Sequence, residues 1–331
     1  MADSVLPQQA DLSPEEKRKN PFHLEFYGAK PNVVKDSSRA LLREYSKIPN
    51  EEIDEWLQKI RQEAFSIFPY PCIGMYRFLD LMLPSTSVYD EVLMRIKDGE
   101  KFLDLGCCFG QEIRQLVFDG ALPENLYRCD LHDEFLQLGY KLFEDTPETM
   151  KATFFPAGVF DDSSVLTKHY GKFSIIYTGS FFHLFDYNQQ LAIAHRVIQL
   201  LAPKPDTLVI GQQLGNDPPG LAALSGFKGE RPRYRHNSES WKELWDRVGK
   251  EVGMKFRTEV VVGSPCEGVQ TAEKGLMQKR EDEGAIRMRL YQDFGYYIPQ
   301  RNGNPITRCI IYSLPTGTAL QMLDYDNQHE H

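Results

Sequence analysis

The residues with the clearest chemical meaning lie in the stretch 101–110, which reads KFLDLGCCFG. Its apolar first half gives way to Gly106 and Gly110, and a pattern typical of a helix follows from Gln111. This order predicts a buried strand that turns sharply into a helix. Glycines at such a turn lack Cβ atoms and the first amide groups of the helix are free, so a ligand can lie directly on the backbone. The stretch therefore predicts a nucleotide-binding turn.

Cys108 separates two kinds of ligand for this turn. In the dinucleotide fingerprint Gly-x-Gly-x-x-Gly the second glycine lets the backbone approach a pyrophosphate, and Cys108 takes that place here. Asp104 would repel a pyrophosphate but offers charge-assisted contacts to an ammonium or sulfonium group, although it could instead only cap the turn. S-adenosylmethionine is cationic and has no pyrophosphate, so we expect it to be the cofactor.

Two later segments would complete a nucleoside site. Asp130 closes the second predicted strand, 20 residues after Gly110, where its two oxygens could accept hydrogen bonds from both ribose hydroxyls. Its alternative role is a helix cap. Residues 159–161, after the third predicted strand, could recognise adenine together with Leu131, or form an ordinary loop. The candidate cofactor contacts are Asp104, Gly106, Cys107, Gly110, Asp130, Leu131, Val159, Phe160, Asp161 and Thr178.

A second group of candidates would face the methyl acceptor. Residues 177–185 include the end of the fourth predicted strand, at the carboxyl edge of the sheet where ligands bind. His183 could act as a general base, orient a substrate that is already ionised, or be a structural histidine. Phe181 and Phe182 could wall an apolar substrate or fill the core. Arg235 lies in an arginine-rich loop and could clamp a substrate carboxylate, although a solvated loop is the commoner arrangement.

The chain before residue 99 is predicted to be a polar, disordered tail (1–20) followed by a helical lid (21–98). Apolar spacing predicts three helices in the lid, the first of them capped by Asn50: 50–68, 73–83 and 88–96. The candidate substrate contacts in this part are Tyr27, Tyr70 and Ile73. We expect the lid to close over cofactor and substrate.

The chain from 99 to 315 alternates between strand and helix patterns and is predicted to be one α/β domain, followed by a tail over 316–331. After the strand in 101–110, the strands are expected at 126–130, 152–157, 173–178, 207–211, 256–262 and 308–314. The helices are expected at 111–118, 133–143, 188–201 and 238–250. Helices between successive strands predict a doubly wound, mostly parallel sheet. Residues 215–236 and 264–283 read as long loops.

Composition excludes several classes of function. The net charge is −9, from 38 basic and 47 acidic residues, which argues against general binding of nucleic acid. The six cysteines form no CxxC pair, and no cysteine and histidine spacing predicts a metal site. No signal peptide or membrane span is expected, so we predict a cytoplasmic protein acting on a small molecule. A homodimer stays open, because an apolar interface and a lid contact look alike in sequence.

The nucleoside-site residues resemble those of class I S-adenosylmethionine-dependent methyltransferases. The resemblance depends on 102–110, Asp130, 159–161 and 175–180, in that order and spacing. Cys108 departs from the family, which usually has a middle glycine there. The resemblance implies a Rossmann-like α/β fold with a seven-stranded, doubly wound sheet.

A closer resemblance is to the methyltransferases of fungal meroterpenoid biosynthesis, such as those of the andrastin, terretonin and austinol pathways. It depends on the motifs Phe26-Tyr27-Gly28, 68–74, 77–79, 103–110 and 180–185. This resemblance implies methylation of a carboxylate on a farnesylated polyketide in secondary metabolism, with a small hydrophobic acid as substrate.

Two other functions stay open at this point. A phenol or another hydroxyl group could be the acceptor, and His183 would then matter more as a base, because a carboxylate is already ionised near neutral pH. A non-catalytic partner protein that binds the cofactor would keep the same fold. Transfer of a labelled methyl group to prenylated acids and phenols separates these functions.

Overall fold

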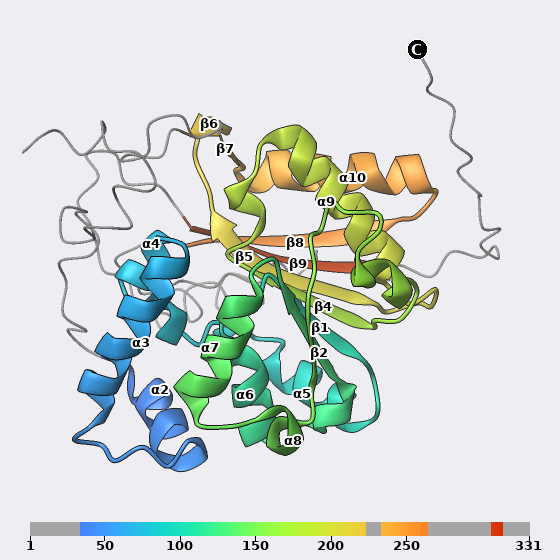
Figure 1. Ribbon diagram of the computed structural model, residues 1–331. Helices are drawn as coiled ribbons and strands as arrows, with labels where there is room; N and C mark the ends of the chain where they lie inside the picture. Colours follow the sequence, from blue (N-terminus) through green and yellow to red (C-terminus); the bar gives the residue numbers. More distant parts are fainter. Residues whose placement is uncertain (1–33, 223–232, 264–305, 314–331) are drawn as a thin grey trace, which may run out of the picture.

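The structure is a computed structural model, and it describes residues 34–222, 233–263 and 306–313. A seven-stranded sheet with the order β3-β2-β1-β4-β5-β9-β8 forms its centre (Figure 1). The strands are β1 Phe102–Leu105, β2 Leu126–Asp130, β3 Thr153–Pro156, β4 Ile175–Gly179, β5 Leu208–Leu214, β8 Phe256–Gly263 and β9 Ile306–Ser313. The first five are parallel, and β9 is antiparallel to both β5 and β8. The predicted doubly wound, mostly parallel sheet is therefore confirmed.

Helices cover both faces of this sheet. On one face lie α9 Tyr187–Leu200 and α10 Ser238–Val252, and on the other lie α5 Tyr89–Lys97, α6 Gln111–Phe118 and α7 Asp133–Phe143 (Figure 1). Short helices connect the strands: η7 Pro123–Asn125, α8 Pro147–Met150, η8 Val165–His169 and η9 Phe182–Leu184. In β5, Val209 joins the core under α9 and α10, whereas Leu208 and Ile210 join the core beside α5 and α6. Both faces are buried, as expected for a parallel sheet.

The N-terminal helices pack onto the cofactor turn and α7. They are α2 Asp36–Ala40, η4 Leu41–Tyr45, α3 Ile53–Ile67, α4 Pro71–Gly74, η5 Arg77–Leu79 and η6 Leu83–Ser85. The ring of Phe78 lies edge-on to Phe109 with a centroid separation of 4.9 Å, and Phe109 meets Phe135 of α7 at 5.7 Å. The Trp56 indole donates to the Leu142 carbonyl at 3.1 Å. The lid and the turn therefore share one apolar core.

Two predictions for this segment are wrong. The first long helix begins at Ile53, after Glu52, and has no side-chain cap, so Asn50 does not cap it. The predicted helix 73–83 is broken into α4, η5 and η6 because Tyr76 adopts a left-handed conformation, with φ 59°, and Pro84 stands at the start of η6. The boundaries of the predicted lid (21–98) and of the predicted α/β domain (99–315) stay predictions. The predicted tails 1–20 and 316–331 lie outside the described residues.

The predicted loop 215–236 contains two short antiparallel strands, β6 Gly220–Ala222 and β7 Arg233–Arg235. The Tyr234 amide donates to the Phe185 carbonyl at 2.9 Å, which brings β7 beside η9 at the carboxyl edge of the sheet. The loop prediction was wrong there because a three-residue strand leaves almost no periodic signal. The predicted loop 264–283 lies outside the described residues.

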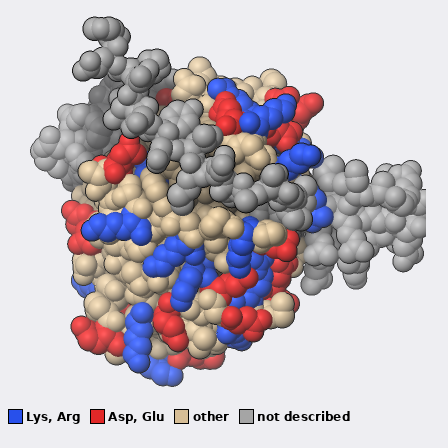
Figure 2. All heavy atoms as spheres, turned by 90° about the vertical axis from the view of Figure 1, so that its right-hand side faces the viewer, with Lys and Arg blue, Asp and Glu red and all other residues tan. Residues whose placement is uncertain are grey.

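Charges are mixed on the face shown in Figure 2. Lysines and arginines alternate there with aspartates and glutamates, and no broad area of that face carries basic side chains alone. In the portion of the chain that the structure covers, no helix is long and apolar enough to cross a membrane. Nor do three potential metal ligands come together among those residues.

Candidate functional site

The cofactor turn connects β1 to α6 in an unusual backbone conformation. Gly106, Cys108 and Gly110 all have positive φ, at 79°, 51° and 68°. The amide groups of Gly106 and Cys107 donate to the Cys129 carbonyl at 2.9 and 3.1 Å, which ties the turn to β2. A Cβ on Gly106 would lie 2.4 Å from the ring of Phe181, so this ring covers the turn directly. Positive φ favours glycine, and Cys108 departs from that preference.

Asp130 binds the turn from the end of β2. Its Oδ2 accepts from the Cys108 amide at 2.8 Å, and its Oδ1 accepts from the His132 amide at 3.2 Å. Burial raises its pKa, and the two amide hydrogen bonds oppose that rise. Each carboxylate oxygen keeps a second lone pair, so Asp130 can still accept from a ribose hydroxyl.

Exposed apolar side chains lie at the place predicted for adenine. Leu131 is 66% exposed and Phe160 is 46% exposed, whereas Val159, which precedes Phe160 in the chain, is buried. Leu131 also approaches Gly158, because a Cβ there would lie 3.7 Å from its Cδ1. Asp161 is occupied locally, since its Oδ1 accepts from the Ser163 amide at 2.8 Å and from the Ser163 hydroxyl at 2.6 Å. Exposed apolar groups of this kind are typical of a ligand groove and fit a flat base.

Asp104 supplies a buried carboxyl group beside the turn. It is 2% exposed, and its Oδ2 has no hydrogen-bond partner. Burial, with Glu112 nearby, raises its pKa well above the usual range. A cationic ligand would satisfy this orphaned oxygen, so the donor set fits S-adenosylmethionine.

Two predicted cofactor contacts have their side chains in the interior. Cys107 is buried, and its carbonyl accepts from the Gly110 amide at 2.8 Å. Thr178 is buried, and its hydroxyl donates to the Ile210 carbonyl at 3.4 Å. Thr178 also lines a small pocket with Phe182, Gln213 and Trp241, against α10. Contact of either residue with the cofactor stays a prediction.

His183 lies in η9 at the acceptor side of the sheet edge. The Leu214 amide donates to its Nδ1 at 3.3 Å. The ring proton of the neutral imidazole must therefore be on Nε2, which makes that atom a donor. Burial lowers the pKa of His183 to about 3, and the positive charges of Arg235, Arg233 and Arg77 add to this effect. His183 is thus neutral near pH 7 and a poor proton acceptor.

Arg235 of β7 is the second notable group at the acceptor side. It is only 9% exposed, and its Nε has no hydrogen-bond partner. Burial and the neighbouring Arg233 lower its pKa. No acidic side chain pairs with it among the residues that the structure describes. The expectation of a solvated loop is wrong for Arg235, and the next residue, His236, is buried as well.

The remaining substrate candidates fall in different environments. Tyr70 is partly buried, and burial with Asp130, Cys72 and Cys108 nearby raises its pKa, so it lies close to the cofactor turn. Ile73 is fully buried in the lid core. Phe182 is a core residue whose ring meets Trp241 edge-on at 5.0 Å. Tyr27 lies outside the described residues.

The sequence reasoning missed two buried arginines behind the turn, Arg128 and Arg114. Arg128 donates to the Phe109 carbonyl at 2.5 Å, and Arg114 donates to the same carbonyl at 2.7 Å. The available signal was a basic residue in the middle of the apolar strand 126–130.

The chain resembles known proteins over most of its length. Residues 26–79 match the family model described as the meroterpenoid methyltransferase N-terminal domain. The O-methyltransferase phiE of a fungal species is 45% identical over 67% of this chain and 74% of phiE. The asnovolin E/chermesin D methyltransferase nvfJ of Aspergillus novofumigatus is 43% identical over 68% of this chain and 81% of nvfJ.

A solved structure is also similar in fold. It is an S-adenosylmethionine-dependent methyltransferase from Archaeoglobus fulgidus, with a TM-score of 0.41 and 12% sequence identity, covering 70% of this chain and 94% of that one. The family assignment depends on the identity of 43–45% to the fungal methyltransferases over about two thirds of the chain. The chain therefore belongs to the S-adenosylmethionine-dependent methyltransferases, within the family of the fungal meroterpenoid methyltransferases.

Proposed function

We propose that this methyltransferase forms the methyl ester of a carboxylate on a farnesylated polyketide, a meroterpenoid intermediate of secondary metabolism. The observation that carries the proposal is the acceptor side itself, where a buried arginine without an acidic partner lies near a neutral histidine. A buried cation without an acidic partner is unfavourable, so we expect an anion that is not among the described residues to bind Arg235. A substrate carboxylate has the required charge and geometry.

The protonation state of His183 favours a nucleophile that is ionised before it binds. A carboxylic acid with an ordinary pKa of about 4 is ionised near neutral pH, whereas a phenol with a pKa of about 10 needs a base. His183 donates from Nε2 and has a pKa of about 3, so it can hold an oxygen but abstracts a proton poorly. Together with Arg235 it could orient one carboxylate oxygen and leave the other free to attack.

When bound, S-adenosylmethionine supplies the methyl group as the electrophile. Transfer to a carboxylate forms one carbon–oxygen bond and breaks one carbon–sulfur bond, and no proton has to move. The chain contributes alignment and exclusion of water, which can lower a barrier substantially. Phe181 over the turn and Tyr70 of the lid are the proposed apolar contacts for this task.

The test uses purified enzyme, labelled S-adenosylmethionine, and matched prenylated aromatic substrates with a free acid, a free phenol or both. We expect label in a base-labile methyl ester, and a rate that is nearly constant between about pH 6 and pH 8. A methyl ether, formed at a rate that rises with pH, would contradict the proposal and support a hydroxyl acceptor. The cytoplasmic location and a homodimer stay sequence predictions, which fractionation and sedimentation can test.

A further inference from the structure

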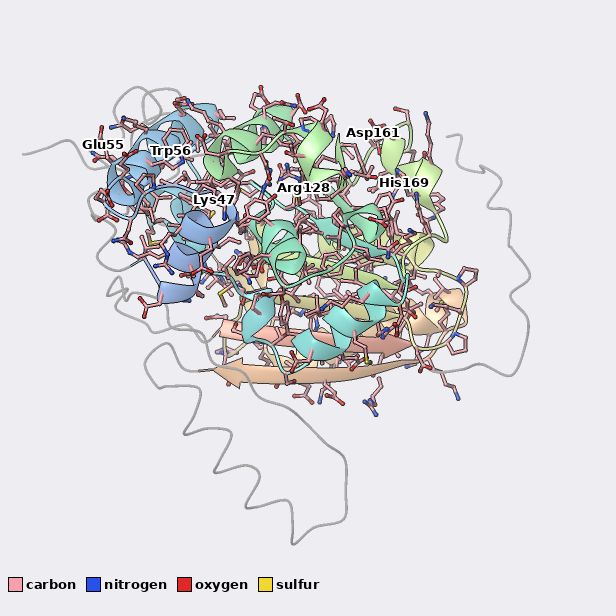
Figure 3. The ribbon with its side chains drawn as sticks, turned by 90° about the horizontal axis from the view of Figure 1, so that it is seen from below. Lys47, Glu55, Trp56, Arg128, Asp161 and His169 are labelled. Atoms are coloured by element: carbon pink, nitrogen blue, oxygen red, sulfur yellow. The ribbon has the colours of Figure 1, made fainter. Side chains whose placement is uncertain are left out.

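Arg128 is a fully buried cation behind the cofactor turn, near the middle of the molecule in Figure 3. Its guanidinium carbon lies 3.2 Å from the centre of the Phe154 ring. Burial and the neighbouring Arg114 lower its pKa to about 10, so it stays charged near neutral pH. Arg128 forms no direct ion pair with an acid among the described residues, although Asp145 and Asp104 are close enough to interact with its charge, and its Nε has no hydrogen-bond partner. Burying a charged guanidinium without a direct ion pair costs free energy, which suggests that Arg128 has a function at this position.

Two hydrogen bonds of Arg128 go to backbone carbonyl groups, and its side chain also interacts with the Tyr140 hydroxyl. Nη1 donates to Phe109 in the turn at 2.5 Å, and Nη2 donates to Leu136 in α7 at 3.3 Å. Arg114 also donates to the Phe109 carbonyl, at 2.7 Å, and is neutralised by Asp145 at 2.7 Å. Two guanidinium groups therefore converge on one carbonyl of the cofactor turn.

Two glycines leave the space that this arrangement needs. A Cβ on Gly110 would lie 2.0 Å from Nη1 of Arg128. A Cβ on Gly139, in the middle of α7, would lie 2.3 Å from the Phe109 carbonyl oxygen. Neither distance is compatible with a side chain, so alanine at either position would displace the contact between Arg128 and Phe109.

The same strand holds the turn at two neighbouring points. Arg128 and Asp130 are two residues apart in β2, so their side chains leave the strand on the same face. Asp130 accepts from the Cys108 amide at 2.8 Å, and Arg128 donates to the carbonyl of the following residue, Phe109. Between these two contacts, Cys108 adopts φ 51°. A side chain disfavours that conformation, so surrounding contacts must hold it.

We propose that Arg128 is a positioning residue for S-adenosylmethionine, which keeps the turn in its binding shape despite the cysteine at position 108. Glycine at 108 would adopt the same conformation without strain, so the turn would then depend less on Arg128. The proposal thus predicts that Arg128 and Cys108 are energetically coupled, although their side chains do not bond each other directly.

The test is a double-mutant cycle with R128M and C108G in the full-length protein, measuring affinity for S-adenosylhomocysteine by calorimetry. We expect R128M to weaken binding by about ten-fold or more, and C108G alone to change it by less than about threefold. In the double variant most of the lost affinity should return. R247M, at an arginine paired with Glu251 on the surface, is the matched control and should bind normally.

Melting temperatures separate positioning from stability alone. If Arg128 only stabilises the fold, R128M will melt earlier but bind S-adenosylhomocysteine as tightly as the wild type, which would overturn the proposal. Additive losses of affinity in the cycle would overturn it as well. If R128M does not fold, G139A replaces it, because the added methyl group displaces the Phe109 carbonyl while alanine favours the helix. C108G should then rescue the affinity of G139A in the same way.

Discussion

The cofactor side and the acceptor side of the site differ in the kind of ligand-facing group that they leave without a partner, which is the Oδ2 of Asp104 on the cofactor side and the Nε of Arg235 on the acceptor side. At the cofactor turn, Asp130 accepts two amide hydrogen bonds, and two arginines bind the Phe109 carbonyl. At the acceptor side, Arg235 is buried with its Nε unpartnered, near a neutral His183. The comparison indicates that contacts within the chain hold the turn in its shape, whereas the acceptor side leaves a buried cation to which we propose that an anionic substrate binds.

The largest effect is expected from R235M, which removes the unpartnered cation. Loss of a charge-assisted contact to the substrate carboxylate should lower kcat/KM for an acid by about 100-fold, with affinity for S-adenosylhomocysteine unchanged. R247M again serves as the control, because Arg247 is half-exposed and pairs with Glu251. If R235M loses cofactor affinity to the same degree, the two sides are not independent and the comparison fails.

The converse change is D130A, on the cofactor side. Loss of the carboxylate should lower the affinity for S-adenosylhomocysteine by about 10- to 100-fold, because the proposed ribose contact and the hydrogen bond from the Cys108 amide disappear together. Calorimetry provides the affinity, and KM for the acceptor at saturating cofactor should change little. Unchanged cofactor affinity would remove Asp130 from the ribose site.

Stability should depend on pH through Glu112, which connects α6 to the lid. Its carboxylate accepts from the amides of Met82 and Leu83 at 2.7 and 3.3 Å, and burial raises its pKa to about 7. Because the folded state binds this proton more tightly than the unfolded state does, the free energy of unfolding should fall as pH rises from about 4.5 to about 7. Burial also raises the pKa of Asp104 and of Asp130, so these two groups too should make the free energy of unfolding fall as pH rises.

Urea unfolding at pH 5.5 and pH 8 measures this dependence. E112Q should reduce the difference between the two pH values by on the order of 2 kcal/mol, because the amide does not ionise. A difference that is as large in E112Q as in the wild type would assign the pH dependence to other groups.

The smallest effect is expected at His183. H183A should lower turnover of a carboxylic acid by about ten-fold, through loss of one orienting hydrogen bond, and H183Q should recover part of it, because its amide can donate from a similar position. The shape of the pH profile should not change in either variant. Loss of a kinetic pKa between pH 6 and pH 8 in H183A would show instead that the histidine acts as a base.

Local patterns in the sequence were sufficient for the cofactor half of the protein. The turn between Gly106 and Gly110, the acid at 130 and the alternation of strands and helices each depend on short-range conformational preferences, so they can be recognised without a structure. The same reasoning placed α6, α7, α9 and α10 within a few residues of their observed ends. It was wrong for 73–83, where Tyr76 and Pro84 interrupt an apolar pattern that otherwise suits a helix.

Only the tertiary structure decided the other half of the site. Pairing of β7 with β6, and its contact with Phe185, bury Arg235 near His183, although the sequence around Arg235 is typical of a solvated loop. Packing of α7 on the turn likewise buries Arg128 against the Phe109 carbonyl. Backbone conformation is encoded by neighbouring residues, whereas the burial and pairing of a charge depend on segments that are distant in the chain. The sequence alone therefore determined the methyl donor and the sheet, and the fold decided which charged side chains are buried at the proposed acceptor side.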